Sequence, residues 1–255
     1  MKIKIINPNS SLDMAAADGV AARAVARPGT EILAVSPEMA PASIESYYDE
    51  FLCVPGILDE IMKGDRDENC DAYIIACYGD PGLHAAREVT AKPVIGIAEA
   101  SLYTASMLAA RFSIVTIIPR FKVCVEEMVA AYGFSNKVAS VRTTPLYVLD
   151  VERDPAACLE GLRAESKLAI EEDDAEAILL GCAGFAEFAN RLEQELSVPV
   201  LDGVVCATKM AEALVELGKT TSKRKTYRFP EKKPFTGMFR QFGSVHEGNG
   251  QSLSK

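Results

Sequence analysis

The sequence has little histidine, and its cysteines do not fall into a metal-binding motif. Only His84 and His246 are present, far apart in the chain, and no Cys-x-x-Cys pair occurs. No Gly-x-Gly-x-x-Gly or Walker-type sequence follows a predicted strand, which argues against nucleotide binding. No lysine is singled out for a Schiff base with pyridoxal phosphate. The sequence therefore predicts a protein without a metal or an organic cofactor.

Long hydrophobic runs are missing as well. No segment approaches the length of a membrane span, and the apolar run at Met1–Pro8 is too short for a signal-peptide core and is interrupted by Lys4. We therefore expect a cytoplasmic protein with no membrane partner. Its seven cysteines, an odd number without a dense framework, are predicted to be reduced thiols.

An excess of positive charge is also absent, because the formal net charge is −9. This balance argues against nucleic acid as a partner. The charge is uneven: nine Lys or Arg and two Glu lie from Lys219 onward, against 18 basic and 34 acidic residues before it. We predict a basic C-terminal tail, 219–255, that either folds back on the protein or on a neighbouring subunit, or is solvated and disordered.

The composition that remains, 49% hydrophobic and 25% charged, is typical of a globular protein. Strand signals alternate with helix-length segments, and the interior strands are almost continuously apolar, as strands covered on both faces must be. The sequence predicts an α/β fold with two similar Rossmann-like lobes, each built on a parallel four-stranded sheet. A pseudo-twofold axis should relate them, with the active site in the cleft where the carboxyl ends of their strands meet.

The order of elements repeats along the chain. Strands are predicted at 3–6, 31–35, the segment before Cys77 and 92–96, and again at 112–118, 139–142, the segment before Cys182 and 198–203. Helices are expected at 12–25, 47–63 and 155–173, with 97–111 linking the halves and 204–217 at the end of the second half. These patterns place the first lobe at 1–98 and 205–218 and the second lobe at 99–204.

Cys77 and Cys182 occupy matching positions in the two halves. Each ends an apolar run, each is followed after one residue by glycine, and each precedes a later strand that opens on Pro-Val. At such a position the free N–H groups and the dipole of the next helix stabilise a thiolate. Two such thiols across a cleft could remove a proton from one face of a carbon acid and return one to the other, which inverts a stereocentre without a cofactor. Either cysteine could instead be a small buried hydrophobe, as we expect for the remaining five.

Several motifs carry a family resemblance across nearly the whole chain. They are Asn7-Pro8-Asn9-Ser10-Ser11, Ala42-Ser43-Ile44-Glu45, Cys77-Tyr78-Gly79-Asp80-Pro81-Gly82, Pro93-Val94-Ile95-Gly96-Ile97, Gly181-Cys182-Ala183-Gly184 and Phe229-Pro230-Glu231-Lys232-Lys233. Together they resemble the hydantoin and allantoin racemases of the aspartate/glutamate racemase superfamily. The resemblance implies a cofactor-independent racemase of five-substituted hydantoins, with Cys77 and Cys182 as the catalytic thiols, and a homo-oligomer, a tetramer or a hexamer.

The same resemblance implies which residues surround the substrate ring: Asn9, Ser43, Ile44, Tyr78, Gly79, Thr116, Ala183 and Gly184. Each has a structural alternative, such as a helix cap for Asn9, a turn for Ser43 and a buried strand hydrogen bond for Thr116. Tyr78 could pack on the ring or face solvent. Asp80 is predicted to cap a helix whose first residue is Pro81, and His84 to lie on the surface.

Departures from glutamate racemases point to a neutral substrate. Those enzymes typically have an Asp in the first loop and Thr-His after the second cysteine, where this chain has Asn7, Asn9 and Ala183-Gly184. A neutral hydantoin needs only neutral donors, and allantoin is the leading candidate. An amino-acid racemase, a cis–trans isomerase of an unsaturated diacid and an arylmalonate-type decarboxylase remain open. So does a non-catalytic hydantoin-binding or thiol redox-sensing protein.

Overall fold

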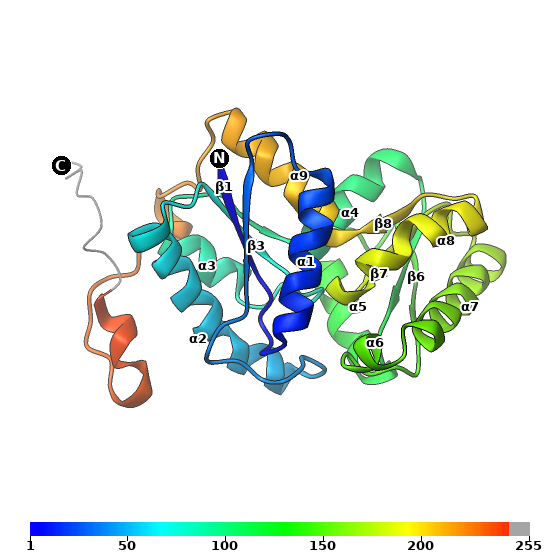
Figure 1. Ribbon diagram of the computed structural model, residues 1–255, viewed down its shortest axis with the longest axis horizontal. Coiled ribbons are helices and arrows are strands. Elements are labelled where there is room, and N and C mark those ends of the chain that lie inside the picture. The colour runs from blue at the N-terminus through cyan, green and yellow to red at the C-terminus, as the bar shows by residue number, and fades with distance from the viewer. Residues whose placement is uncertain (245–255) are drawn as a thin grey trace.

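The chain folds into two parallel four-stranded sheets covered by helices, as predicted (Figure 1). The computed structural model describes residues 1–244 of the 255-residue chain. Within this part of the chain, no helix combines the length and the apolar character needed to cross a membrane.

The first sheet has the strand order β2-β1-β3-β4, with every neighbouring pair parallel. Its strands are β1 (Lys2–Ile6), β2 (Glu31–Val35), β3 (Ala72–Ile75) and β4 (Val94–Gly96). The second sheet repeats that order as β6-β5-β7-β8 and is also parallel. Its strands are β5 (Phe112–Thr116), β6 (Val138–Thr143), β7 (Ile178–Gly181) and β8 (Val200–Asp202). The predicted duplication of the sheets is confirmed.

The helices alternate with the strands. They are α1 (Leu12–Val25), α2 (Tyr47–Lys63), α3 (Leu83–Val89), α4 (Ile97–Leu108), α5 (Lys122–Ala131), α6 (Asp150–Arg153), α7 (Pro155–Asp173), α8 (Ala189–Leu196) and α9 (Gly203–Glu216), with a short 3-10 helix at Ala183–Phe188. The predicted helices 12–25, 47–63 and 155–173 have these bounds. The predicted helix 97–111 ends earlier, at Leu108.

One predicted helix start is wrong. Asp80 and Pro81 precede α3, which begins at Leu83, and its N-cap residue is Gly82 with a left-handed φ of 69°. The Asp80 carboxylate instead accepts hydrogen bonds from the backbone N–H groups of Ala98 (3.1 Å) and Glu99 (2.8 Å), so it caps α4. A side chain that caps a helix of another segment leaves no local sequence signal.

The two halves are joined by helices at the centre of the molecule. α4 packs along α9, and α9 also contacts α1 and the first-sheet strands β3 and β4 (Figure 1). One hydrophobic core extends through these helices into both sheets. The chain therefore returns to its first half after β8, although the lobe boundaries themselves stay a prediction.

The described part of the C-terminal tail folds back on the first half. The backbone N–H of Thr221 donates to the Ala91 carbonyl (2.9 Å), and Lys223 Nζ donates to the carbonyls of Arg87 and Glu88 in the last turn of α3. His84 lies on the surface, where its ring stacks on Tyr227 of the tail and bonds to the Tyr227 hydroxyl (2.8 Å). Residues 245–255 of the predicted tail lie outside the described residues.

Candidate active site

A pocket lies where the carboxyl ends of the central strands of both sheets meet. Asn7 follows β1, Cys77 follows β3, Ile117 follows β5 and Cys182 follows β7, and all four line this pocket. Ligand sites in open α/β sheets form at the carboxyl ends of the strands. The structure thus brings the two predicted thiols, from opposite halves of the chain, into one site. We call it the thiol pocket.

The thiol pocket is small and mostly apolar. Its other lining residues are Pro8, Asn9, Met14, Ile44, Ala76, Tyr78, Phe121, Val148, Gly181, Ala183 and Gly184. Its volume of about 30 Å³ is room for one or two water molecules.

The two thiols have corresponding backbone neighbours. The backbone N–H of Gly79 acts to lower the pKa of the Cys77 thiol, and the N–H of Gly184 does the same for Cys182. Each donor belongs to the glycine two residues after the cysteine. The repeated Cys-x-Gly sequence therefore produces a repeated thiolate-binding turn.

Burial opposes these N–H groups and dominates the acidity of both thiols. It raises the pKa of the Cys77 thiol well above its ordinary value, and it raises the pKa of the Cys182 thiol to about 12. Desolvation disfavours a charged thiolate. Both thiols are therefore neutral in the closed pocket near neutral pH, and a thiolate formed there is a strong base.

Glu50 on α2 is an acidic neighbour of Cys77 that the sequence did not reveal. Its carboxyl group occupies the space that a side chain at Gly79 would need. Burial, followed by the charge of Asp49, raises the pKa of Glu50 to about 7. The ionised carboxylate in turn raises the pKa of the Cys77 thiol. In the sequence, Glu50 looks like an ordinary acidic residue in the first turn of a helix.

The loop after β1 is held by side-chain amides. Asn7 Nδ2 donates to Asn9 Oδ1 (2.8 Å) and to the Ser11 carbonyl (3.0 Å), while the Ser11 N–H also donates to Asn9 Oδ1 (2.8 Å). Ser11 rather than Asn9 caps α1, because its hydroxyl accepts from the Met14 N–H. Asn9 is buried and lines the thiol pocket.

The remaining predicted residues divide into those that line the thiol pocket and those that do not. Ile44, Ala183 and Gly184 line it, whereas Ser43 beside Ile44 is half-buried outside the lining. Tyr78 also lines it, but the alternative that it faces solvent is wrong. Tyr78 is 2% exposed, and its hydroxyl shares a hydrogen bond with Ser101 on α4 (3.0 Å).

Thr116 lies behind the lining. It is fully buried, and its hydroxyl donates to the Gly181 carbonyl (2.7 Å) directly before Cys182. A side chain at Gly181 would lie only 2.6 Å from Thr116, so the absence of a side chain at Gly181 leaves the space that Thr116 occupies. Thr116 therefore holds the end of β7, which is the buried-strand alternative weighed for it.

Several lining residues were not among the predicted site residues. Asn7 and Ile117 directly follow the central strands β1 and β5, so the rule that ligands bind at strand ends could have identified them. Phe121 and Val148 come from the segments after β5 and β6 and carry no local signal. Within residues 1–244, no group of three or more His, Cys, Asp or Glu side chains is arranged to hold a metal ion.

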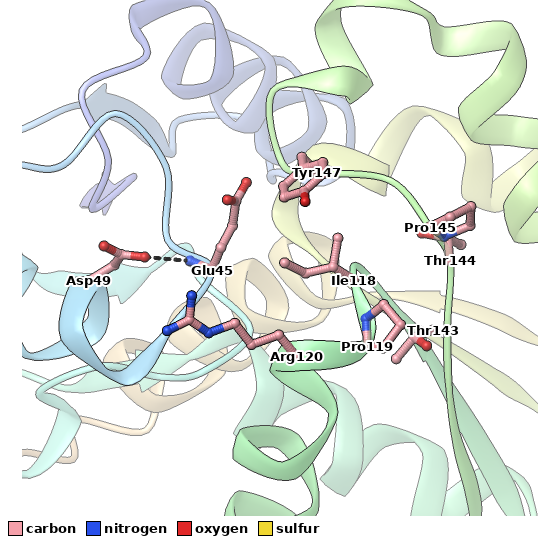
Figure 2. A pocket seen from close by; sticks show the side chains of 9 residues that line it. All are labelled: Glu45, Asp49, Ile118, Pro119, Arg120, Thr143, Thr144, Pro145 and Tyr147. Atoms are coloured by element: carbon pink, nitrogen blue, oxygen red, sulfur yellow. Dashed lines mark hydrogen bonds between the residues drawn. The ribbon is translucent and has the colours of Figure 1, made fainter.

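Figure 2 shows the residues that line a second, larger and open cavity, of about 520 Å³. Both sites draw on the same three segments. Ile44, Ile117, Phe121 and Val148 line the thiol pocket, while their chain neighbours line the larger cavity. We call the larger site the outer cavity. Its lining is Glu45, Asp49, Ile118, Pro119, Arg120, Thr143, Thr144, Pro145 and Tyr147.

Known proteins with similar sequences and folds carry racemase names. The family model described as "Asp/Glu/Hydantoin racemase" matches residues 3–211. A protein named hydantoin racemase from Pseudomonas sp. (strain NS671) is 62% identical over 243 residues, which cover 95% of this chain and 97% of that relative. Another hydantoin racemase, from Rhizobium meliloti, is 45% identical over 93% of this chain and 98% of its own length.

Solved structures agree with the sequence relatives. The allantoin racemase from Klebsiella pneumoniae superposes with a TM-score of 0.92 at 47% identity, covering 94% of this chain and 98% of that one. Arylmalonate decarboxylase, at a TM-score of 0.63 and 18% identity, shares the fold. Given the match over residues 3–211 and the 62% identity to a relative covered almost end to end, the chain belongs to the Asp/Glu/hydantoin racemase family and is an isomerase of the racemase type.

Proposed function

We propose that this racemase acts on five-substituted hydantoins, with Cys77 and Cys182 as its two acid/base groups. The observation that carries the proposal is the shared pocket. The two thiols come from corresponding strand ends of the two sheets, and both line the same pocket. General acid and base catalysis requires groups within reach of the same carbon.

The proposed reaction is a proton transfer at each face of the ring. The thiolate of one cysteine takes the hydrogen from ring carbon 5, and the electron pair of that C–H bond moves into the adjacent carbonyl as an enolate. The thiol of the other cysteine then gives its proton to the opposite face. The two sulfurs exchange protonation states in each turnover, and the reverse reaction begins from the exchanged state.

The lining of the thiol pocket favours a neutral ring over an amino acid. Among the described residues, no Asp, Glu, Lys, Arg or His side chain lines it, and its polar side chains are Asn7, Asn9, Tyr78 and the two thiols. A free amino acid brings a carboxylate and an ammonium, which are costly to bury without partners. Allantoin, whose ring is neutral, is the leading substrate, and two solved relatives are named allantoin racemases.

The test follows optical rotation from one enantiomer of allantoin and of a simple substituted hydantoin, with the uncatalysed rate subtracted. Each of the variants Cys77→Ser and Cys182→Ser should lose about 10²- to 10⁴-fold in turnover. Cys206→Ala replaces a buried thiol on α9 outside the pocket and serves as the control. Undiminished racemisation by either serine variant would refute the two-thiol mechanism.

The location and the assembly of the protein are further proposals. We expect a cytoplasmic homo-oligomer, a tetramer or a hexamer, acting on a small molecule and binding neither nucleic acid nor membrane. The net charge of −9 supports the absence of a nucleic-acid partner. Light scattering of the full chain would measure the assembly directly.

A further inference from the structure

The outer cavity lies beside the thiol pocket. Three pairs of neighbouring residues form the boundary between them: Ile44 and Glu45, Ile117 and Ile118, and Val148 and Tyr147. In each pair one residue lines the thiol pocket and the other lines the outer cavity. A ring held between the thiols therefore has a large space beside it, of about 520 Å³, for the substituent on carbon 5.

Both carboxylates in the outer cavity are already engaged. Glu45 Oε1 accepts a hydrogen bond from the Val148 backbone N–H (2.9 Å), which ties the loop before α2 to the loop before α6. Asp49 Oδ2 accepts from the Ser46 hydroxyl (2.7 Å) and from the Glu45 N–H (3.1 Å), and it helps fix the start of α2. Figure 2 shows the bond between Asp49 and the Glu45 backbone.

Arg120, unlike the two carboxylates, has a charged group without a partner among the described residues. It is exposed, and within residues 1–244 its guanidinium forms neither a hydrogen bond nor an ion pair. In Figure 2 it extends from the segment after β5 into the outer cavity, toward the loop that carries Glu45. A guanidinium presents five N–H donors in a planar fork that matches the two oxygens of a carboxylate or the oxygen of a urea.

We propose that the outer cavity binds the substituent on carbon 5 and that Arg120 selects substituents ending in an oxygen acceptor, such as a ureido carbonyl or a carboxylate. This inference rests on the proposed hydantoin racemase function. Ile118, Pro119 and Pro145 provide apolar surface for the stem of the substituent. The ureido group of allantoin fits this description, which gives a structural reason for the leading substrate.

The experiment compares kcat/KM for three hydantoins that differ only in the substituent: allantoin, 5-(2-carboxyethyl)hydantoin and 5-isobutylhydantoin. Arg120→Met keeps the stem of the side chain and removes its donors. This variant should lose about 10- to 100-fold on the two acceptor-bearing substrates, since hydrogen bonds to charged groups are among the stronger ones. On the isobutyl compound the loss should stay within about threefold. Arg120→Lys should recover part of the carboxylate activity, and Arg66→Met, at an exposed arginine outside both pockets, is the control.

Two results would overturn the inference while leaving the proposed function intact. One is an equal loss on all three substrates, which would make Arg120 a support for the pocket wall. The other is no change on any of them. If the unaltered enzyme racemises none of the three compounds, the proposed function itself fails, and the inference fails with it.

Discussion

Each thiol depends on a glycine two residues later, but the two glycines are not equivalent. Gly79 is packed against the Glu50 carboxyl group and has Phe121 at 3.4 Å from the place of a side chain. At Gly184 the nearest atoms to the place of a side chain belong to Val151 on α6, at 3.3 Å or more. The space around the glycine of the Cys-x-Gly sequence is therefore more crowded at Cys77 than at Cys182.

The alanine variants of these glycines should differ. Gly79→Ala forces the Glu50 carboxyl out of its place and should cost about 1–3 kcal/mol of the free energy of unfolding, as overpacking does. Gly184→Ala should cost less than about 1 kcal/mol, since Val151, at 3.3 Å, must move by only a few tenths of an ångström. Urea unfolding of both variants is the measurement. Combining Gly79→Ala with Glu50→Ala should restore part of the loss, and equal costs for the two single variants would contradict the account.

The acidity of the thiols predicts an alkaline rise in activity. Burial raises the pKa of both, to about 12 for Cys182, so the thiolate fraction at neutral pH is small. Because that fraction grows about tenfold per pH unit below the pKa, kcat/KM should rise with pH through 7 to 9. A profile that is flat or falling over this range would contradict the prediction.

A variant of Glu50 tests the same pH dependence of kcat/KM more specifically. Above its own pKa of about 7 the Glu50 carboxylate raises the pKa of Cys77. Glu50→Gln removes that charge, so it should raise kcat/KM at pH 8 and leave it little changed at pH 6. The change in kcat/KM must be the same for racemisation of either enantiomer, because the two enantiomers have equal free energies and the equilibrium constant is therefore one.

Among the elements, the helices after the last strand of each sheet begin in related ways. Asp202 at the end of β8 caps α9 through the Val205 N–H (2.8 Å). The corresponding helix α4 takes its cap from Asp80 in the loop after Cys77, and Asp80 also accepts from the Tyr132 hydroxyl (2.8 Å). Asp80 thus ties the loop that carries a proposed catalytic thiol to α4 at the centre of the molecule.

Removing this cap should be costly. Asp80→Ala leaves two N–H groups and the Tyr132 hydroxyl without their acceptor in a buried place, so we expect a loss of about 2–4 kcal/mol in the free energy of unfolding. Asp154→Ala removes the exposed cap of α7 and should cost about 1 kcal/mol. Denaturant unfolding compares them. An equal loss in both variants would show that Asp80 is an ordinary cap.

Elements with local signals were predictable from the sequence. The bounds of α1, α2 and α7 follow from Ser11, Ser46 and Asp154, whose side chains cap them, and from the apolar face behind each cap. The role of Asp80 was not predictable, because its partner helix begins many residues later. Local sequence specifies a cap only when the capped N–H groups follow within the same turn.

At the scale of the whole molecule, the duplication made the thiol pair predictable. Matching Cys-x-Gly sequences at two strand ends place the sulfurs in one pocket once two lobes face each other. Glu50 and Arg120 could not be found in this way. Glu50 meets the site through the packing of α2 on the loop after Cys77, and Arg120 lines a cavity whose other residues come from both halves of the chain. Ser43 and Thr116 are adjacent to lining residues in the chain or the sheet, but lie outside the lining itself.

Two buried carboxyl groups should make the stability of the whole fold depend on pH. Burial, followed by the charge of Asp202, raises the pKa of Asp18 well above its ordinary value, and burial raises that of Asp202 to about 6. Raised values mean that the folded state favours the protonated acids. Their contribution to stability is therefore complete below about pH 4, the ordinary carboxyl range, and is lost as the pH rises through about 6 and beyond.

Asp18→Asn should remove much of this dependence. Its unfolding free energy, measured between pH 4 and 7, should fall less steeply with pH than that of the unaltered protein. Asp13→Asn, at an exposed position of the same helix, is the matched control and should keep the original slope. Parallel curves for all three proteins would contradict the prediction.

The central claim concerns both halves together: two thiols, one from each sheet, act on opposite faces of one ring. Racemisation of a single enantiomer of allantoin in D₂O tests it most directly, with deuterium at carbon 5 measured separately in substrate and product at early times. We predict a product that carries solvent deuterium while the remaining substrate keeps its hydrogen, because one sulfur removes the proton and the other supplies its replacement. Deuterium entering both enantiomers at the same early rate would show a single base acting on both faces and would contradict the account.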